Sequence, residues 1–392
     1  MSGDALYPGS TLGIIGINRN GGALIAAAKK AGFNVGVYVD HAQPAITKMA
    51  DFTIVGAYND KDKLTEFGEN SDAVIYQTPN IDSRVIRFLN QFAAVPQGIN
   101  GLEIVQDRLM ERAFLDQINI NIAPYVTVVS LDDVYQSIDS IGYPALLKPI
   151  QRGIGEQSMM ISRQSDIARA ADFISTGTYL LESWIDHTAE YTMTAATDGD
   201  QVEIYPLAKL QFSADRQLIA VATPAVVDDD LLTEMQRIVK SVASSLEYHG
   251  VFSLNFYVTA NGSLYVKNIE LGMTSIANVY DSSANVTQYE EQLRAAVGMP
   301  LHIVRSLQPA LLMVIRKKQE AAIQRQWLLK DNWQFRLFDL PAVDDDSLIG
   351  FVWVTGSSSL DELEDQVDDT EVWDEPIAPN DAPQNNDNDE IL

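Results

Sequence analysis

The stretch Q-D-R-L-M-E-R-A-F-L at residues 106–115 begins an ordered series of segments that decides the fold of this chain. Three more segments follow it, Y-P-A-L-L-K at 143–148, L-E-S-W-I-D-H-T-A-E-Y at 181–191 and G-V-F-S-L-N-F-Y-V at 250–258. Each of these three contains an apolar run of strand length that carries charged or amide side chains. We expect the strands to line one cleft, between residues 145–190 and a hairpin over 252–270.

The region before this series reads as a small parallel α/β domain over residues 1–103. Four apolar runs alternate with helix-like stretches, at Leu12–Ile17, Asn34–Val39, Phe52–Val55 and Ala73–Tyr76. A glycine turn and the helical stretch Ala23–Lys30 follow the first run, and Asp40 ends the second, which is the opening of a dinucleotide-type βαβ unit. The spacing Gly16-x-Asn18-x-x-Gly21 lacks the middle glycine, so a structural turn and a phosphate loop fit it equally.

The pattern of the sequence changes after residue 103, and it predicts a second domain over residues 104–303. Its first part, about 121–185, reads as a lid of short strands and two helical stretches, at Val126–Val129, Leu131–Ser140, Ala145–Lys148, Ser158–Ile161, Ser165–Ser175 and Tyr179–Glu182. A mostly antiparallel sheet follows, with hairpin turns at Asp198-Gly199 and Asn261-Gly262. Its expected strands are Glu190–Thr197, Val202–Leu210, Leu218–Val221, Phe252–Val258 and Leu264–Ile269, and a helix is expected over Asp230–Leu246.

The remaining residues predict a small β-rich domain over 304–372 and an acidic, disordered tail over 373–392. The formal net charge is −27, and no Lys or Arg follows Arg336. Such a field repels phosphate backbones, which argues against nucleic-acid binding. Cysteine is absent, which excludes thiolate chemistry, and neither a signal peptide nor a membrane span is recognisable. A cytoplasmic protein without a membrane partner is expected.

Lys148 is the first candidate for ligand binding. It ends an apolar strand and precedes a loop with two glycines, Gly153 and Gly155, that could close over phosphates. A lysine at this position is a point charge suited to nucleotide phosphates. The alternative is a lysine at the edge of a sheet.

Glu182 and Glu190 lie eight residues apart around Trp184 and Ile185. Main-chain groups near this apolar pair could bind the edge of an adenine ring, while Glu190 accepts hydrogen bonds from ribose hydroxyls. The alternative for either acid is a solvated surface side chain. The four histidines (His41, His187, His249 and His302) share no metal or triad spacing, and surface or supporting roles are expected for them.

Asn255 and Asn268 occupy central positions in two predicted strands, where asparagine is disfavoured. Both therefore predict a polar cleft. Two amides are poor Mg²⁺ ligands, because this ion prefers anionic oxygens in octahedral geometry. Glu270, two residues after Asn268 on the same strand face, could support only a displaced ion.

Taken together, the segments resemble the ATP-grasp enzymes of purine biosynthesis, and the family of N5-carboxyaminoimidazole ribonucleotide synthetases (carboxylase ATPase subunits) most. The similarity spans roughly residues 10–356. The best matches are Q-D-R-L-M-E-R-A-F-L, I-A-P-Y (122–125), I-G-Y-P-A-L-L-K, Y-P-L (205–207) and Q-Y-E-E-Q-L-R-A-A-V-G-M-P-L (288–301). The resemblance implies an α/β (overall α+β) ATP-grasp fold, with a Rossmann-like pre-ATP-grasp domain in front and a small β-rich domain behind.

The resemblance also implies a carbon–nitrogen ligase that uses ATP, with Mg²⁺ on the phosphates, and a small-molecule substrate. Carried over by position, Arg108 and Lys148 contact the phosphates, Glu182 and Ile185 the adenine, and Glu190 the ribose. A homodimer is expected on the same basis. No catalytic residue is assigned.

Departures from the family are concentrated at the other end of the site. Asn255 and Asn268 replace the two family magnesium ligands, both Glu. The family run A-P-R-x-H-N-S-G-H becomes residues 270–278, and the glycine loop is shortened to 152–157. A basic segment that holds the substrate phosphate becomes 338–351, with Asp344–Asp346 in its middle. Two hypotheses stay open: a ligase with altered substrate or metal placement, and a non-catalytic homologue that binds a nucleotide or a protein partner.

Overall fold

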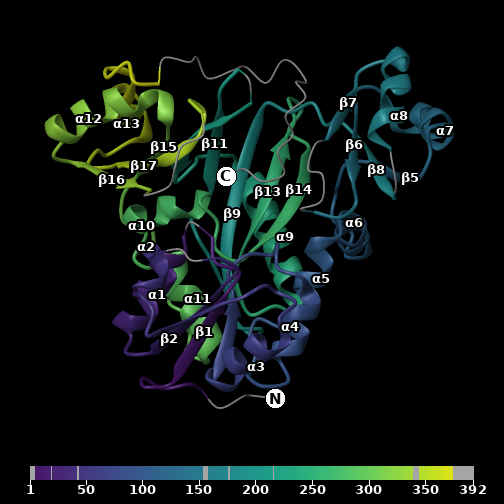
Figure 1. Ribbon diagram of the computed structural model, residues 1–392. Helices are drawn as coiled ribbons and strands as arrows, with labels where there is room; N and C mark the ends of the chain where they lie inside the picture. Colours follow the sequence, from purple (N-terminus) through teal and green to yellow (C-terminus); the bar gives the residue numbers. More distant parts are fainter. Residues whose placement is uncertain are drawn as a thin grey trace.

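The computed structural model of this chain describes residues 5–18, 20–41, 44–152, 158–174, 177–214, 216–338 and 344–373. A large central sheet dominates the molecule (Figure 1). The N-terminal α/β layer lies at its lower end, and a lobe containing β5 to β8 stands apart at the upper right.

A parallel sheet in the order β3-β2-β1-β4 forms the N-terminal layer. Its strands are short apolar runs, as expected for parallel strands covered on both faces. The predicted limits of β2, β3 and β4 coincide with the observed ones. The elements are β1 (Thr11–Ile15), α1 (Gly21–Lys30), β2 (Asn34–Val39), α2 (Pro44–Thr47), β3 (Phe52–Val55), α3 (Lys61–Glu69), β4 (Ala73–Tyr76), α4 (Ser83–Leu89), α5 (Asn100–Gln106) and α6 (Arg108–Gln117).

The lobe contains an antiparallel sheet in the order β5-β8-β6-β7. Its elements are β5 (Tyr125–Val128), α7 (Leu131–Ile141), β6 (Ala145–Pro149), β7 (Met159–Ile161), η1 (Gln164–Arg169), α8 (Ala170–Phe173) and β8 (Tyr179–Ser183). The helical stretch predicted over Ser165–Ser175 consists of a 3₁₀ helix followed by a short α-helix, and Ser175 lies outside the described residues. The Asp166 carboxylate accepts hydrogen bonds from the backbone N–H groups of Ser162 and Arg163, which holds the first turn tight.

The central sheet has the order β14-β13-β9-β11-β12-β15-β17-β16, and β10 pairs with β9. Both predicted hairpins are present, β9–β10 and β13–β14. The elements up to residue 297 are β9 (Ala189–Thr197), β10 (Val202–Ile204), β11 (Ala208–Phe212), β12 (Leu218–Thr223), α9 (Asp229–Ser245), β13 (Gly250–Val258), β14 (Leu264–Leu271), η2 (Ile276–Val279), α10 (Tyr280–Ser283) and α11 (Gln288–Val297).

The strand predicted over 202–210 is two strands, β10 and β11. Pro206 lies between them, and proline cannot donate a backbone hydrogen bond to a neighbouring strand. Both strands still pair with the same edge of β9, β10 with its end and β11 with its beginning, and β11 also pairs with β12.

The strands after residue 304 continue the central sheet. β15 pairs with β12, and β17 pairs with β15 and β16. The elements here are β15 (Ala310–Arg316), η3 (Lys317–Gln319), α12 (Glu320–Leu329), β16 (Trp333–Leu337), β17 (Leu348–Val354) and α13 (Leu360–Asp368). Within the described ranges, no helix combines the length and apolarity needed to cross a bilayer.

Candidate nucleotide site

The predicted segments meet where the lobe approaches the β13–β14 hairpin. A pocket that is partly open to solvent lies at this junction. Its lining combines apolar walls with a few charged groups, as small-molecule sites do. The lining residues are Arg112, Ala123, Leu146, Lys148, Glu182, Ser183, Trp184, Ile185, Tyr257, Val266 and Lys267.

Glu182 is buried between two cations in this pocket. Arg112 Nε donates to Glu182 Oε1 at 2.7 Å, and Lys148 Nζ lies 3.4 Å from Glu182 Oε2. β6 and β8 are adjacent strands, which brings Lys148 and Glu182 together. Both side chains are almost fully buried, so the alternatives of a solvated acid and an edge lysine do not hold. Burying charges is costly unless they are paired, and here they are.

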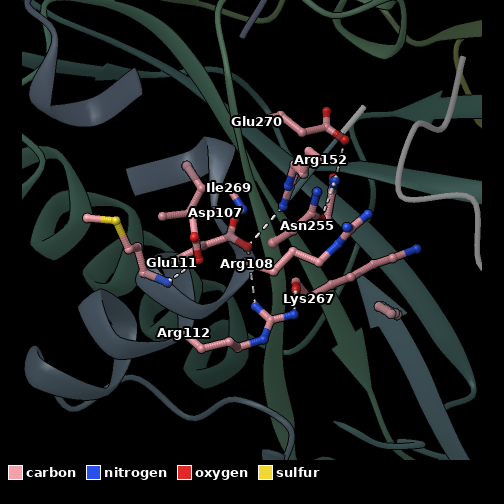
Figure 2. Close-up of polar contacts among 12 residues, drawn as sticks. Asp107, Arg108, Glu111, Arg112, Arg152, Asn255, Lys267, Ile269 and Glu270 are labelled. Carbon is pink, nitrogen blue, oxygen red and sulfur yellow. Dashed lines mark hydrogen bonds and ion pairs between the residues drawn. The ribbon is translucent and has the colours of Figure 1, made fainter. Parts of the chain in front are cut away.

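Helix α6 turns charged residues toward the interior, and its buried face carries Arg108, Glu111, Arg112 and Leu115. Glu111 Oε1 accepts from the backbone N–H of Ile269 at 2.6 Å, and Glu111 Oε2 accepts from Arg152 Nη2 at 2.9 Å. Arg112 Nη2 donates to the carbonyl of Lys267 at 2.8 Å. Figure 2 shows the Glu111 carboxylate at the centre of these contacts. The helix thereby fastens strand β14 to the lobe.

Arg108 lies against the end of the strand that carries Lys148. Its Nη1 donates to the carbonyl of Pro149 at 2.6 Å, and its backbone N–H donates to the carbonyl of Ile150. The two predicted phosphate cations therefore belong to one corner of the site. Gly153 and Gly155, predicted to close over the phosphates, lie outside the described residues.

Glu190 is the centre of a second buried cluster. His187 Nε2 lies 2.9 Å from its Oε1, Arg216 Nη2 lies 3.3 Å from the same oxygen, and Lys267 Nζ lies 3.4 Å from its Oε2. Burial pushes the pKa of Glu190 upward, but Lys267, His187 and Arg216 outweigh it, and the net pKa shift is downward. The carboxylate is thus ionised at neutral pH. The Arg216 guanidinium also lies over the Trp184 ring, 5.6 Å from its centroid.

Asn255 and Asn268 face each other across β13 and β14, and both are buried. Asn255 Nδ2 donates to Asn268 Oδ1 at 3.0 Å and to Glu270 Oε1 at 2.9 Å. An ionised carboxylate only accepts hydrogen bonds, so Glu270 fixes the orientation of the Asn255 amide. Burial raises the pKa of Glu270, and Arg152 and Asn255 offset only part of this pKa shift.

This end of the site does not fit a magnesium ion. The Asn255 amide presents its NH₂ group to both neighbouring oxygens, and Glu270 is a single carboxylate whose charged form burial disfavours. Mg²⁺ needs anionic or carbonyl oxygens in near-octahedral order. Across the part of the chain that the structure describes, no group of three or more His, Cys, Asp or Glu side chains could hold a metal ion.

The acidic segment near residue 345 lies in an exposed turn before β17. Asp346 is 3.3 Å from Lys318 Nζ, and its carbonyl accepts from Arg316 Nη1 at 2.9 Å. Basic side chains therefore accompany these acids. Phe338 and residues 344–351 of the compared segment are described, whereas residues 339–343 are not.

Sequence reasoning missed several charged residues of the site: Glu111, Arg112, Arg152, Arg216 and Lys267. A signal existed for Glu111 and Arg112, which with Arg108 follow the spacing of one helix face. The sequence positions of Arg216 and Lys267 do not predict that both side chains contact Glu190. Among the histidines, only His187 contacts the cluster; it is buried, consistent with a supporting role.

Two family models match this chain. Residues 10–106 match the ribonucleotide synthetase preATP-grasp domain, and residues 113–272 match the ATP-grasp domain. The chain is therefore an ATP-grasp protein with a pre-ATP-grasp domain in front, a mixed α/β architecture that confirms the predicted fold class.

Its relatives are N5-carboxyaminoimidazole ribonucleotide synthases, of which it is a divergent homologue. The Bacillus subtilis (strain 168) protein is 26% identical over 315 residues, covering 80% of this chain and 83% of the relative. The Staphylococcus aureus (strain MRSA252) protein is 24% identical over 358 residues, covering 90% and 95%.

Solved structures give the same fold. An ADP complex of an N5-carboxyaminoimidazole ribonucleotide synthetase superposes with a TM-score of 0.88 at 22% identity, covering 95% of this chain and 98% of that one. The Aspergillus clavatus N5-carboxyaminoimidazole synthase, in complex with ADP and 5-aminoimidazole ribonucleotide, gives a TM-score of 0.85 at 17% identity, covering 94% and 100%.

Proposed function

We propose that this chain binds ATP in the pocket of Lys148, Glu182, Trp184 and Ile185, and that it does not carry out the carboxylation of its relatives. Lys148 and Arg108 neutralise the phosphates, Glu182 and the main chain near Ile185 hold the adenine, and Glu190 accepts from the ribose. The observation that carries the proposal is the contrast within one cleft. Charged groups are buried and paired around the pocket, whereas two amides stand where the family has carboxylates.

The relatives' reaction needs positioning and charge neutralisation of a transferring phosphoryl group. The donor set at Asn255, Asn268 and Glu270 does not supply a magnesium site, and a substrate phosphate would approach Asp344–Asp346. A non-catalytic role as a nucleotide-binding or partner-binding homologue follows. The competing hypothesis is a ligase of altered substrate that relies on Glu270, and the same experiment separates the two.

The test combines binding and turnover on the unmodified protein. ATP, bicarbonate, aminoimidazole ribonucleotide and MgCl₂ are supplied, and phosphate release and carboxylated product are measured beside calorimetric ATP binding. We expect ATP binding without carboxylation. Carboxylation coupled one-to-one to ADP release would contradict the proposal and support the ligase.

Repairing the metal site alone should not restore the reaction. Asn255→Glu with Asn268→Glu still leaves the acids of the 344–346 turn facing the substrate phosphate. Addition of Asp344→Arg, Ser347→Arg and Leu348→Lys is the minimum further change that we expect to be needed. Carboxylation by the double variant alone would show that the acidic turn does not matter.

A further inference from the structure

Lys267 enters the site through an irregularity of the β13–β14 ladder. Asn255 pairs with Asn268, but the next residue, Phe256, pairs with Val266, so Lys267 is the extra residue of a β-bulge. Bulges re-aim side chains that would otherwise alternate between the two faces of a sheet. Lys267 consequently reaches the pocket, although Asn268 beside it also faces the cleft.

The Lys267 ammonium lies between the two ends of the site. It is 3.4 Å from Glu190 Oε2 on the ribose side and 5.3 Å from the centroid of the Tyr257 ring. On the other side its charge favours the ionised form of Glu270. The side chain is only 8% exposed, so solvent screens this charge little. Lys267 is thus a fixed cation between the predicted ribose group and the position of the lost metal ligands.

Further fixed positive charge faces the same place. Arg152 reaches it from the end of the lobe and also favours the ionised form of Glu270. Figure 2 shows Arg152 and Asn255 beside Glu270, with Lys267 further down the same cluster. Lys267 and Arg152 bring two positive charges to this place beside Glu270, and each also has an ion-pair partner, Glu190 for Lys267 and Glu111 for Arg152. A polyphosphate that reached these two cations would be attracted by them, whereas a divalent ion would be repelled by them.

Two buried polar groups at this end can donate to a phosphate. Among the described residues, Asn268 Nδ2 and Thr192 Oγ1 have no hydrogen-bond partner, and both can donate. Thr192 is paired with Asn255 across β9 and β13, so these donors belong to one place in the sheet. Donors that are buried without partners are costly unless a ligand satisfies them.

We propose that Lys267 is a resident cation that takes the place of the divalent ion, so that this site binds nucleoside triphosphate in its metal-free form. The inference rests on the proposed nucleotide binding and adds to it the ionic form of the ligand. Lys267 acts on the phosphates directly, together with Arg152, and the amide of Asn268 donates instead of coordinating.

The test is calorimetric titration of the full chain with ATP, once in EDTA and once in excess MgCl₂. We expect dissociation constants that agree within about threefold in the two conditions. Lys267→Gln should weaken binding in EDTA by about tenfold or more, while Lys267→Arg, which keeps the charge, should stay within about threefold of the unmodified protein. Lys209→Gln, an exposed lysine of the same sheet, is the matched control.

The other possible outcomes contradict either the role of Lys267 as a resident cation or the proposed nucleotide binding itself. Tightening by Mg²⁺ of more than about tenfold would overturn the resident-cation inference and leave nucleotide binding intact. Equal metal-free binding by Lys267→Gln and the unmodified protein would also overturn it. Equal losses in the Gln and Arg variants, with unchanged thermal unfolding, would assign Lys267 a packing role. Absence of ATP binding in both conditions would overturn the proposed function together with this inference.

Discussion

The two ends of the cleft differ in how they satisfy buried polar groups. Around the pocket, Glu182 and Glu190 are each held by two or more cationic or imidazole groups. At the other end, Asn255 and Asn268 bond to each other, and each keeps one buried atom without a partner among the described residues. The first end is built from paired charges, whereas the second combines two amides with a single carboxylate, Glu270.

This difference shows that contacts within the protein, and not a metal ion, hold the second end of the cleft together. Asn255 and Asn268 are directly paired in the β13–β14 hairpin, and helix α6 fastens this hairpin to the lobe through Glu111. A scaffold that is held by α6 accommodates the two buried amides of Asn255 and Asn268. Chemistry can therefore change at one end while the pocket persists at the other.

The largest expected effect is a loss of stability when Glu111, which joins the two ends of the cleft, is replaced. Glu111→Ala leaves Arg152 and Arg112 beside a buried gap without their carboxylate partner. It also removes the acceptor of the Ile269 N–H. We therefore expect a loss of about 3–5 kcal/mol in the free energy of unfolding. Urea unfolding measures it, with the exposed Glu66→Ala as control. A loss below about 1 kcal/mol would mean that α6 does not fasten the hairpin.

Asp281 is a further buried carboxylate, and a substitution there tests how burial affects its ionisation. Its Oδ2 lies 3.0 Å from Arg336 Nη2. Burial raises the pKa of Asp281 to about 6, although Arg336 lowers it in part. Because the folded-state pKa is raised, the stabilisation by this group is complete below about pH 4 and disappears as the pH rises through 6. Relative to Asp281→Asn, the unmodified protein should therefore lose up to about 3 kcal/mol of unfolding free energy between pH 4 and pH 7.

Urea titrations of both proteins across this pH range measure the difference. Asp200→Asn, in an exposed turn, is the control and should give a difference that does not change with pH. A flat difference for Asp281→Asn as well would show that Asp281 is as easily ionised in the folded chain as in the unfolded one.

A substitution of Lys148 tests the pocket end of the cleft. Lys148→Met removes a buried phosphate cation but keeps the length of the side chain, so ATP binding should weaken by about 10- to 100-fold, or about 1.4–2.8 kcal/mol. Calorimetry with ATP and with adenosine separates the phosphate contact from the pocket, because adenosine binding should change much less. Equal losses for both ligands would place Lys148 in the packing of the pocket, and Lys209→Met serves as the control.

The smallest expected effect is a regained response to magnesium. Asn255→Glu with Asn268→Glu adds two carboxylates, and Mg²⁺ should then tighten ATP binding by about tenfold, or about 1.4 kcal/mol. Asn255→Gln with Asn268→Gln changes the size of the side chains without charge and should show no such response. If Mg²⁺ does not tighten ATP binding by the Glu variant either, the charge at positions 255 and 268 does not explain the difference between the two ends of the cleft.

Much of the fold was predictable because it depends on local patterns. Strands β2, β3 and β4 are short apolar runs between polar loops, and the turn residues Asp198-Gly199 and Asn261-Gly262 mark the hairpins. The break at Pro206 was missed because the apolar pattern continues across it. Lys148 and Glu182 were predictable as partners in one site, because strand ends with charged residues in a fixed order point to a common cleft.

By itself the sequence determined the ATP-grasp scaffold, Lys148, Glu182 and Glu190 as charged residues of one cleft, and the two asparagines, Asn255 and Asn268, in the middle of neighbouring strands. Only the tertiary structure decided that β15, β16 and β17 continue the central sheet, that Arg112 links Glu182 to strand β14, and that Lys267 faces the pocket. The physical reason is that strand order and a one-residue bulge depend on pairing between distant segments. Which face a side chain occupies follows from that pairing and not from local periodicity.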